Sequence, residues 1–169
     1  MLDTIKYCYE NKLVTYFYFD SQELCGYIAY YNDDEVVINH ISPNGLYDGY
    51  IVRHISDIAV IDYDCKYCKQ IEKLYKIRNQ THKAIDFNAD EIIYTMLDFA
   101  KENNYIISLD VKDMDFSGIV VDYKDNIITI NEVDKNGEKD GINVIDLDNV
   151  NSLFVDTEDE QKLRLLLNN

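Results

Sequence analysis

Proline, glycine, tryptophan and positive charge are all scarce in this chain of 169 residues. One proline and six glycines exclude collagen-like, proline-rich and flexible-linker sequences. The chain has 16 lysines and arginines against 32 aspartates and glutamates, so its formal net charge is −16. Such acidity disfavours sequence-independent binding to nucleic acid, because it repels the phosphate backbone.

Long apolar runs and a leader-like N-terminus are also missing. No stretch approaches the roughly 18–20 apolar residues that span a bilayer, and the longest runs are pieces such as residues 58–61. The first six residues do not combine a charged segment with an apolar one, as a signal peptide does. Hydrophobic residues nevertheless make up 47% of the chain. We therefore expect a folded, soluble, cytoplasmic protein without a membrane segment.

An internal repeat organises the sequence. When the chain is aligned with itself at an offset of 92, fourteen residue pairs are identical in one ungapped register. Two Asn-Gly pairs coincide, at residues 44–45 and 136–137, and so do the Asp-Gly pairs that follow each of them. Turn dipeptides would not fall into one register by chance. We interpret the chain as two copies, residues 1–79 and 90–169, joined by a linker over residues 80–89.

Each copy shows the same order of predicted elements. A short amphipathic helix is followed by five short apolar stretches, with counterparts 92 residues later. In the first copy these stretches lie at about residues 13–19, 25–31, 35–41, 49–55 and 57–63.

Turn and cap residues mark the ends of these elements. Residues 33–34 (Asp-Asp) and 125–126 (Asp-Asn) are typical of a tight turn between the second and third strands. Asp64 and Asp156 stand just before a closing helix, where we expect each to act as its N-cap.

The layout resembles the Sm-like fold, a small bent β-barrel. The segment from Gly118 to Ile130 looks like the first Sm motif, and residues 140–150 stand where the second Sm motif would. Each copy also resembles a family of bacterial proteins, without an assigned activity, that has a Gly-Phe-Val strand, an Asp-Gly turn and a Leu-Asp-x-Ile strand. The resemblance implies an α+β protein of two tandem small Sm-like barrels, each with a short helix before and after its five strands.

The same resemblance raises RNA binding, which Sm proteins carry out with two loops. The first loop of Sm proteins has the pattern Asp-x-x-apolar-Asn. The asparagine expected at its fifth position is replaced by Val37 in the first copy and by Thr129 in the second. In the second loop the first copy has Arg53-His54, similar to the Lys-His pair of the bacterial Sm-like RNA chaperone. The second copy has Asp146 there, which would repel a phosphate. We do not expect nucleic-acid binding, and an RNA-binding first copy is the alternative function.

Chemistry-bearing motifs are sparse. Cys65 and Cys68 form a CxxC pair, but a zinc site needs two further ligands, and no second CxxC or HxxxH is present. The second copy has Thr157 and Glu160 at these positions. A nucleophile–base pair and a phosphate-binding glycine loop are also missing. We therefore expect no metal, no cofactor and no enzymatic activity; a metal or redox role for the cysteine pair is the alternative.

Tyrosine is unevenly distributed, with 12 of the 15 tyrosines in residues 1–80. Tyr16, Tyr18, Tyr30 and Tyr47 stand where the second copy has polar residues, so we expect them to face outward, whereas Phe17 should face the core. Tyrosine is enriched at recognition surfaces. We prefer an interface here; the alternative is a face covered by the other copy, the linker or a second chain.

Charge is uneven as well. Residues 1–80 carry 8 basic and 12 acidic residues, and the remainder carries 8 and 20. Lys66, Lys69, Lys73 and Lys76 recur at helical spacing and form a cationic stripe. The stripe is either a solvated helix face or a surface that docks on the acidic second copy.

Taken together, these features predict a non-catalytic, acidic protein-interaction module whose protein partner is unknown. An inhibitor or immunity-type protein that masks a basic surface is one form of such a module, because acidity steers a protein toward cationic partners. The oligomeric state stays open. The candidate interface residues are Tyr16, Tyr18, Tyr30, Tyr47, Arg53, His54, Lys66, Lys69 and Lys73.

Overall fold

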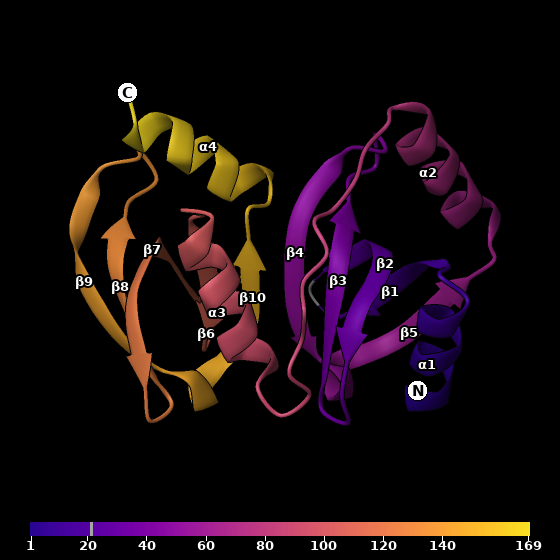
Figure 1. The fold of residues 1–169 in the computed structure, drawn as a ribbon, viewed down its shortest axis with the longest axis horizontal. Helices are drawn as coiled ribbons and strands as arrows, with labels where there is room; N and C mark the ends of the chain where they lie inside the picture. Colours follow the sequence, from indigo (N-terminus) through magenta and orange to yellow (C-terminus); the bar gives the residue numbers. More distant parts are fainter. Residues whose placement is uncertain (21) are drawn as a thin grey trace. The chain divides into compact units, whose positions relative to one another are not determined.

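Two units make up the chain in the computed structural model, which describes residues 1–20 and 22–169 (Figure 1). The first unit is Met1–Ile92 and the second is Ile93–Asn169. Within the described residues, every helix is too short or too polar to cross a membrane.

The first unit has antiparallel strands with helices before and after them. Its strands pair in the order β5-β1-β2-β3-β4, and helices α1 and α2 pack on β2 and β1. In chain order the described elements are α1 (Leu2–Glu10), β1 (Val14–Phe19), β2 (Glu23–Tyr31), β3 (Glu35–Ile41), β4 (Tyr47–His54), the 3-10 helix η1 (Ile55–Asp57), β5 (Ile58–Tyr63) and α2 (Lys66–Ile77).

The second unit has the same order of elements. Its strands pair as β10-β6-β7-β8-β9, and β8, β9 and β10 have the bounds of β3, β4 and β5 shifted by 92 residues. The described elements are α3 (Ile92–Glu102), β6 (Ile107–Val111), β7 (Met114–Lys124), β8 (Ile127–Val133), β9 (Lys139–Asp146), the 3-10 helix η2 (Leu147–Asn149), β10 (Val150–Val155) and α4 (Glu158–Leu167).

The predicted pair of small barrels, each flanked by helices, is wrong. The ten strands of the described residues form open antiparallel sheet. In the first unit β5 pairs with β1 and β4 pairs with β3, so these two strands end the ladder instead of closing it. The turn at η1 separates them, and the helices on β1 and β2 cover the core that barrel closure would otherwise enclose.

Alternation along β1 builds the core of the first unit. Phe17 and Phe19 are buried, whereas Tyr16 and Tyr18 on the opposite face are partly exposed. Phe17 and Phe19 face the core as predicted, following the two-residue period of a strand. Tyr16 is only partly exposed, because its face of β1 packs against a buried cluster that includes Cys68 of α2.

One glycine position is required in both units. A Cβ at Gly26 would clash with the backbone oxygen of Asn39, and a Cβ at Gly118 would clash with that of Asn131. Neighbouring strands therefore approach each other too closely there for any side chain.

The prediction that Asp64 and Asp156 cap the closing helices is wrong by one position. The N-caps are Cys65 and Thr157. The two aspartates instead have left-handed backbones, with φ of 57° and 55°. Short polar side chains tolerate this conformation, which turns the chain from the strand into the helix.

The segment predicted as a linker, residues 80–89, packs on the first unit. Nε2 of His82 lies 3.0 Å from the backbone oxygen of Gly49. The Phe87 ring stacks on Tyr30 with a centroid distance of 5.0 Å, and the Asn32 side chain donates to the backbone oxygen of Ala89 at 3.0 Å. These contacts fix the segment along β4 and the end of β2.

Candidate interaction surface

Three tyrosine rings meet at the border of the packing between α2 and β1, where Tyr16 lies against buried Cys25 and Cys68. Tyr16 and Tyr18 project from β1, and Tyr67 projects from the first turn of α2. The Tyr16 ring centroid lies 4.9 Å from that of Tyr18 and 5.2 Å from that of Tyr67, both in edge-on geometry. Tyr67 is 39% exposed, and the other two are partly exposed. We call these three residues the tyrosine surface.

Two carboxylates fix the hydroxyl groups of this surface. The Tyr16 hydroxyl donates to Glu23 at 2.5 Å, and the Tyr18 hydroxyl donates to Asp62 at 3.2 Å. The hydrogen bond to Glu23 is the main cause that raises the pKa of Tyr16, and desolvation followed by the bond to Asp62 raises the pKa of Tyr18. Both phenols therefore stay protonated, and their rings are held in place.

Tyr67 was missed by the sequence analysis. It stands inside the CxxC pair, which drew attention to the cysteines instead of the ring between them. Its counterpart in the second copy is Asp159. The comparison that selected Tyr16 and Tyr18, tyrosine against a polar residue, would have found it.

Tyr30 and Tyr47, which were expected to face outward with the other tyrosines, contact residues 80–89. Tyr30 stacks on Phe87. The Tyr47 ring lies 4.7 Å from the ring of His82, and its backbone amide donates to the Gln80 side chain at 3.0 Å. Both residues thus belong to an intramolecular contact and lie apart from the tyrosine surface.

Arg53 lies in the interior of the first unit. It is 8% exposed, and its guanidinium carbon lies 4.0 Å above the centre of the Phe19 ring. One of its nitrogens donates to the Gln22 side chain at 3.2 Å. A guanidinium in this position stabilises the packing of β1 against β4 and does not face solvent as a phosphate contact would.

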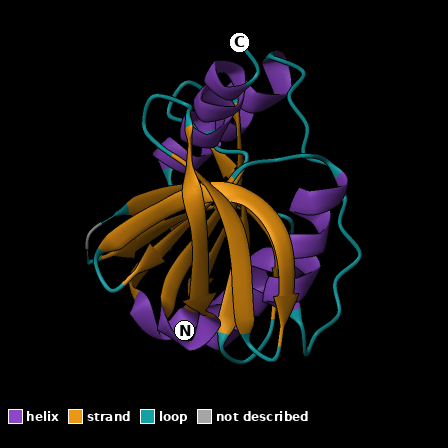
Figure 2. Cartoon of the chain, turned by 90° about the vertical axis from the view of Figure 1, so that its left-hand side faces the viewer, coloured by secondary structure: helices purple, strands orange, loops and turns teal. Residues whose placement is uncertain are grey.

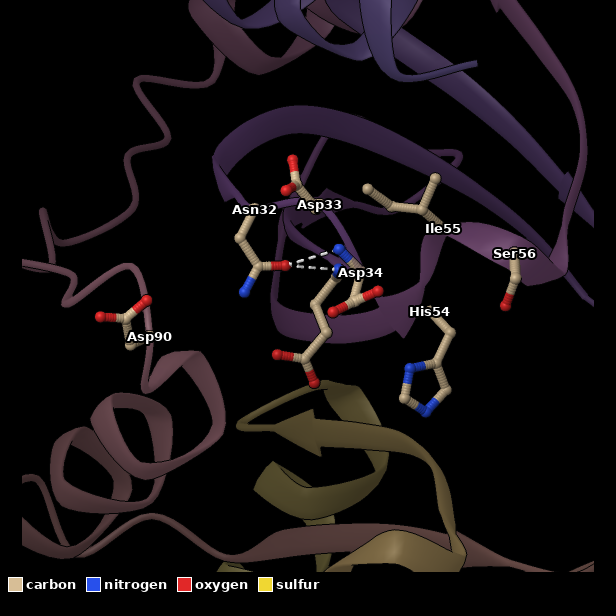
Figure 3. A pocket seen from close by; sticks show the side chains of 8 residues that line it. Asn32, Asp33, Asp34, His54, Ile55, Ser56 and Asp90 are labelled. Atoms are coloured by element: carbon tan, nitrogen blue, oxygen red, sulfur yellow. Dashed lines mark hydrogen bonds between the residues drawn. The ribbon is translucent and has the colours of Figure 1, made fainter.

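His54 lines an acidic cleft of about 660 Å³ in the first unit (Figure 3). Burial raises the pKa of Glu35, and the neighbouring His54 opposes this shift. The cleft presents mainly carboxylates and one imidazole, which are groups that attract a cationic side chain. Its lining residues are Asn32, Asp33, Asp34, Glu35, His54, Ile55, Ser56 and Asp90.

The side chain of Asn32 organises the floor of this cleft. Its Oδ1 accepts from the backbone amides of Asp34 and Glu35 at 2.9 and 2.7 Å (Figure 3). This turn is where the tight connection between the second and third strands was predicted, and the structure confirms it. The Ser56 hydroxyl at the opposite side donates to the carboxylate of Asp57 at 3.4 Å.

The four lysines of the cationic stripe are exposed on α2, where Lys76 pairs with Glu72 at 2.7 Å. Lys69 pairs with Asp64 at 2.6 Å, and Lys66 and Lys73 are exposed. An exposed ion pair of this kind contributes little to stability, because water and salt screen it. The stripe therefore presents positive charge beside the tyrosine surface, because Tyr67 of this surface lies in the first turn of the same helix.

The cysteine pair lies at the start of α2. Sγ of Cys65 accepts from the backbone amide of Cys68 at 3.2 Å and lies 2.9 Å from its Sγ. Burial raises the pKa of Cys65, while a hydrogen bond with Cys25 and then burial raise that of Cys68. Residues 1–20 and 22–169 contain no group of three or more histidine, cysteine or carboxylate side chains suited to a metal ion.

The second unit has polar residues where the first has these thiols. Oε1 of Glu160 accepts from the Ser108 hydroxyl at 2.6 Å, and Ser108 contacts Ser117 at 2.7 Å. Oε2 of Glu160 accepts from the backbone amide and the hydroxyl of Thr157, completing a capping box. The Thr-x-x-Glu spacing of residues 157–160 is the sequence pattern that predicts such a capping box.

An acidic cleft of about 590 Å³ lies beside this network. At an offset of 92 it shares one position with the tyrosine surface, because Asp159 in its lining corresponds to Tyr67. Asp115 in the lining corresponds to Glu23, which binds the Tyr16 hydroxyl in the first unit.

Comparison of the chain with protein-family models, with curated proteins and with solved structures finds no match in any of the three. The resemblance to Sm-like proteins therefore stays a prediction at the level of sequence motifs.

Proposed function

We propose that this chain is a non-catalytic protein-interaction module and that its partner protein binds the tyrosine surface of the first unit. The observation that carries this proposal is the contact of three partly exposed tyrosine rings, two of them fixed by carboxylates. Rings that are already ordered lose little entropy on binding, and tyrosine is prominent among the residues that dominate interface energies.

The net charge of the chain and the two carboxylates at the tyrosine surface support a basic partner, whereas the lysines of α2 beside this surface would face acidic side chains of that partner. The net charge of −16 raises the local concentration of cationic proteins around the chain. Glu23 and Asp62 lie at the tyrosine surface itself, where they would accept hydrogen bonds from lysine or arginine of the partner. An inhibitor or immunity-type protein that masks a basic surface is one form this function takes.

An exchange between the two copies tests the proposal. The variant Tyr16→Ser/Tyr67→Asp installs the residues of the second copy, Ser108 and Asp159, which that unit accommodates. Tyr7→Ser is the matched control, because Tyr7 is an exposed tyrosine on α1 outside the surface. Tagged full-length chains are expressed in the native cell, and the proteins that purify with each are quantified.

We expect a protein that purifies with the wild type and with the Tyr7→Ser control but not with the double variant. The purified partner should bind the double variant about tenfold more weakly or worse. If every protein that purifies with the wild type also purifies with the double variant, and circular dichroism shows that both variants are folded, the proposal is wrong. Filter binding of single-stranded RNA at low salt is measured in parallel, and RNA binding lost in the double variant would favour the RNA-binding alternative.

A further inference from the structure

In the first unit, residues 80–89 cover the outer face of β4. The Tyr50 side chain on this face is only 1% exposed. Its hydroxyl accepts from the backbone amide of Lys83 at 2.9 Å and lies 3.3 Å from the backbone oxygen of Lys83. The rings of Tyr47 and His82 pack beside it. The chain itself therefore shows how an extended segment binds this type of sheet face.

The equivalent face of the second unit has no such cover within the described residues. Ile142, which corresponds to Tyr50, is 67% exposed, and Val144 is 68% exposed. Ile127 on the neighbouring strand β8 is also exposed. A Cβ at Gly141 would meet no atom within 4 Å, so the start of β9 is open as well. We call Ile127, Ile142 and Val144 the apolar β8–β9 face.

Strand β9 also ends the sheet of its unit. It pairs with β8 and has no second partner in the described strand order. In Figure 1 it lies at the outer side of its unit, and Figure 2, viewed from that side, shows the nearest strands without a helix over them. An eight-residue edge strand with two exposed aliphatic side chains and no proline is a template for an added extended segment.

The charge of the second unit specifies the chemistry of the segment. Residues 93–169 carry 7 basic and 17 acidic residues. The carboxylate of Asp146 is exposed on β9 two residues after Val144, whereas Asp140 lines the acidic cleft with Glu132, Asp159 and Lys162. A segment that combines apolar and basic side chains would contact both groups.

We infer that the apolar β8–β9 face binds an extended segment of another protein that carries apolar side chains for Ile142 and Val144 and a basic side chain for Asp146. The inference goes beyond the proposed function, because this site lies in the second unit and its residues are separate from the tyrosine surface. The chain then has two binding sites, one in each unit.

A fluorescent peptide provides the test. Its sequence is that of residues 80–89 with lysine in place of Asp86, which keeps the template segment and adds positive charge. A second peptide carries glutamate in place of Lys83 and retains Asp86. Binding to the full chain is measured by fluorescence anisotropy at low salt, against wild type, Ile142→Thr/Val144→Thr and the control Val60→Thr. Val60 is an exposed strand valine of the first unit.

We expect the basic peptide to bind the wild type and Val60→Thr equally, and to bind Ile142→Thr/Val144→Thr about tenfold more weakly, as the loss of two apolar contacts implies. It should also slow amide hydrogen exchange in β9. Equal binding to all three chains, no binding at all, or no preference over the acidic peptide would each overturn the inference.

A wild-type chain that dimerises in the absence of peptide, together with a monomeric Ile142→Thr/Val144→Thr variant, would show that a second copy occupies the face instead. The Tyr16→Ser/Tyr67→Asp variant should bind the peptide like the wild type, which separates this test from that of the proposed function.

Discussion

The hydroxyl of Tyr75 lies 2.7 Å from Nδ1 of His82, which joins the last turn of α2 to the segment that follows it. Nε2 of the same ring faces the backbone oxygen of Gly49. A carbonyl oxygen only accepts, so the neutral imidazole carries its proton on Nε2 and accepts from Tyr75 at Nδ1. Burial lowers the pKa of His82 to about 4.

Acidification should therefore destabilise the first unit through His82. The ring titrates near 6.5 in the unfolded chain and near 4 in the folded chain, so the unfolded state binds the proton first as the pH falls. The stabilisation is complete above pH 6.5 and is lost toward pH 4. His82 alone should lower the free energy of unfolding by about 2 kcal/mol between pH 7 and pH 5.

Urea denaturation at several pH values, for wild type and His82→Gln, measures this contribution. The wild type should be the more stable at pH 7, and the difference should shrink as the pH falls, because the variant has no group that titrates there. Two curves that run parallel from pH 7 to pH 4 would contradict the assignment.

Gly26→Ala and Gly118→Ala should each lower the free energy of unfolding by about 2 kcal/mol or more, because the added methyl group meets the backbone of the adjacent strand. Gly141→Ala is the matched control. Its φ of 102° strains any other residue but the position is open, so a smaller loss of about 1 kcal/mol is expected. Thermal and chemical unfolding rank the three variants, and losses at Gly26 and Gly118 no larger than at Gly141 would contradict the steric clash with the adjacent strand.

Arg53 should behave as a structural residue. Arg53→Ala removes the cation above Phe19 and the bond to Gln22, and should lower the free energy of unfolding by about 1–3 kcal/mol. Lys66→Ala on exposed α2 should change it by less than about 0.5 kcal/mol. If Arg53→Ala left stability unchanged, the contact of the guanidinium with the Phe19 ring would not stabilise the first unit.

The cysteines should differ in reactivity. Cys65 is partly exposed, while Cys8, Cys25 and Cys68 are buried. Iodoacetamide should modify Cys65 first, and more slowly than a free thiol at pH 7.5, because its pKa is raised. Peptide mass spectrometry over a time course identifies the order. Rapid modification of Cys68 in the folded chain would contradict its burial.

The strands themselves could be predicted from the sequence with fair accuracy. The third stretch, residues 35–41, has the bounds of β3, and the tight turn at residues 33–34 is present. Alternation separates Phe17 from Tyr16 and Tyr18, as expected. These features depend on local periodicity and turn chemistry, which short sequences carry by themselves.

The features that failed depend on contacts between distant residues. Barrel closure was inferred from a motif, but whether β4 meets β5 depends on the path of the chain through η1 and on the helices that cover the sheet. Arg53 looked like an exposed loop residue because nothing in its local sequence shows that Phe19 lies beneath it. Residues 80–89 were predicted as a linker because they lie between the two copies, whereas Lys83 contacts Tyr50, more than thirty positions away.

The position of residues 80–89 decides where the chain can be divided. A fragment that ended at residue 79, the boundary of the first copy, would remove His82 and Phe87 and leave the rings of Tyr30, Tyr47 and Tyr50 without their cover. Such a fragment would be prone to aggregate through a newly exposed aromatic sheet face. A fragment that keeps these rings covered has to extend through residue 89, so the length of the repeated sequence and the length of the first compact unit are different quantities in this protein.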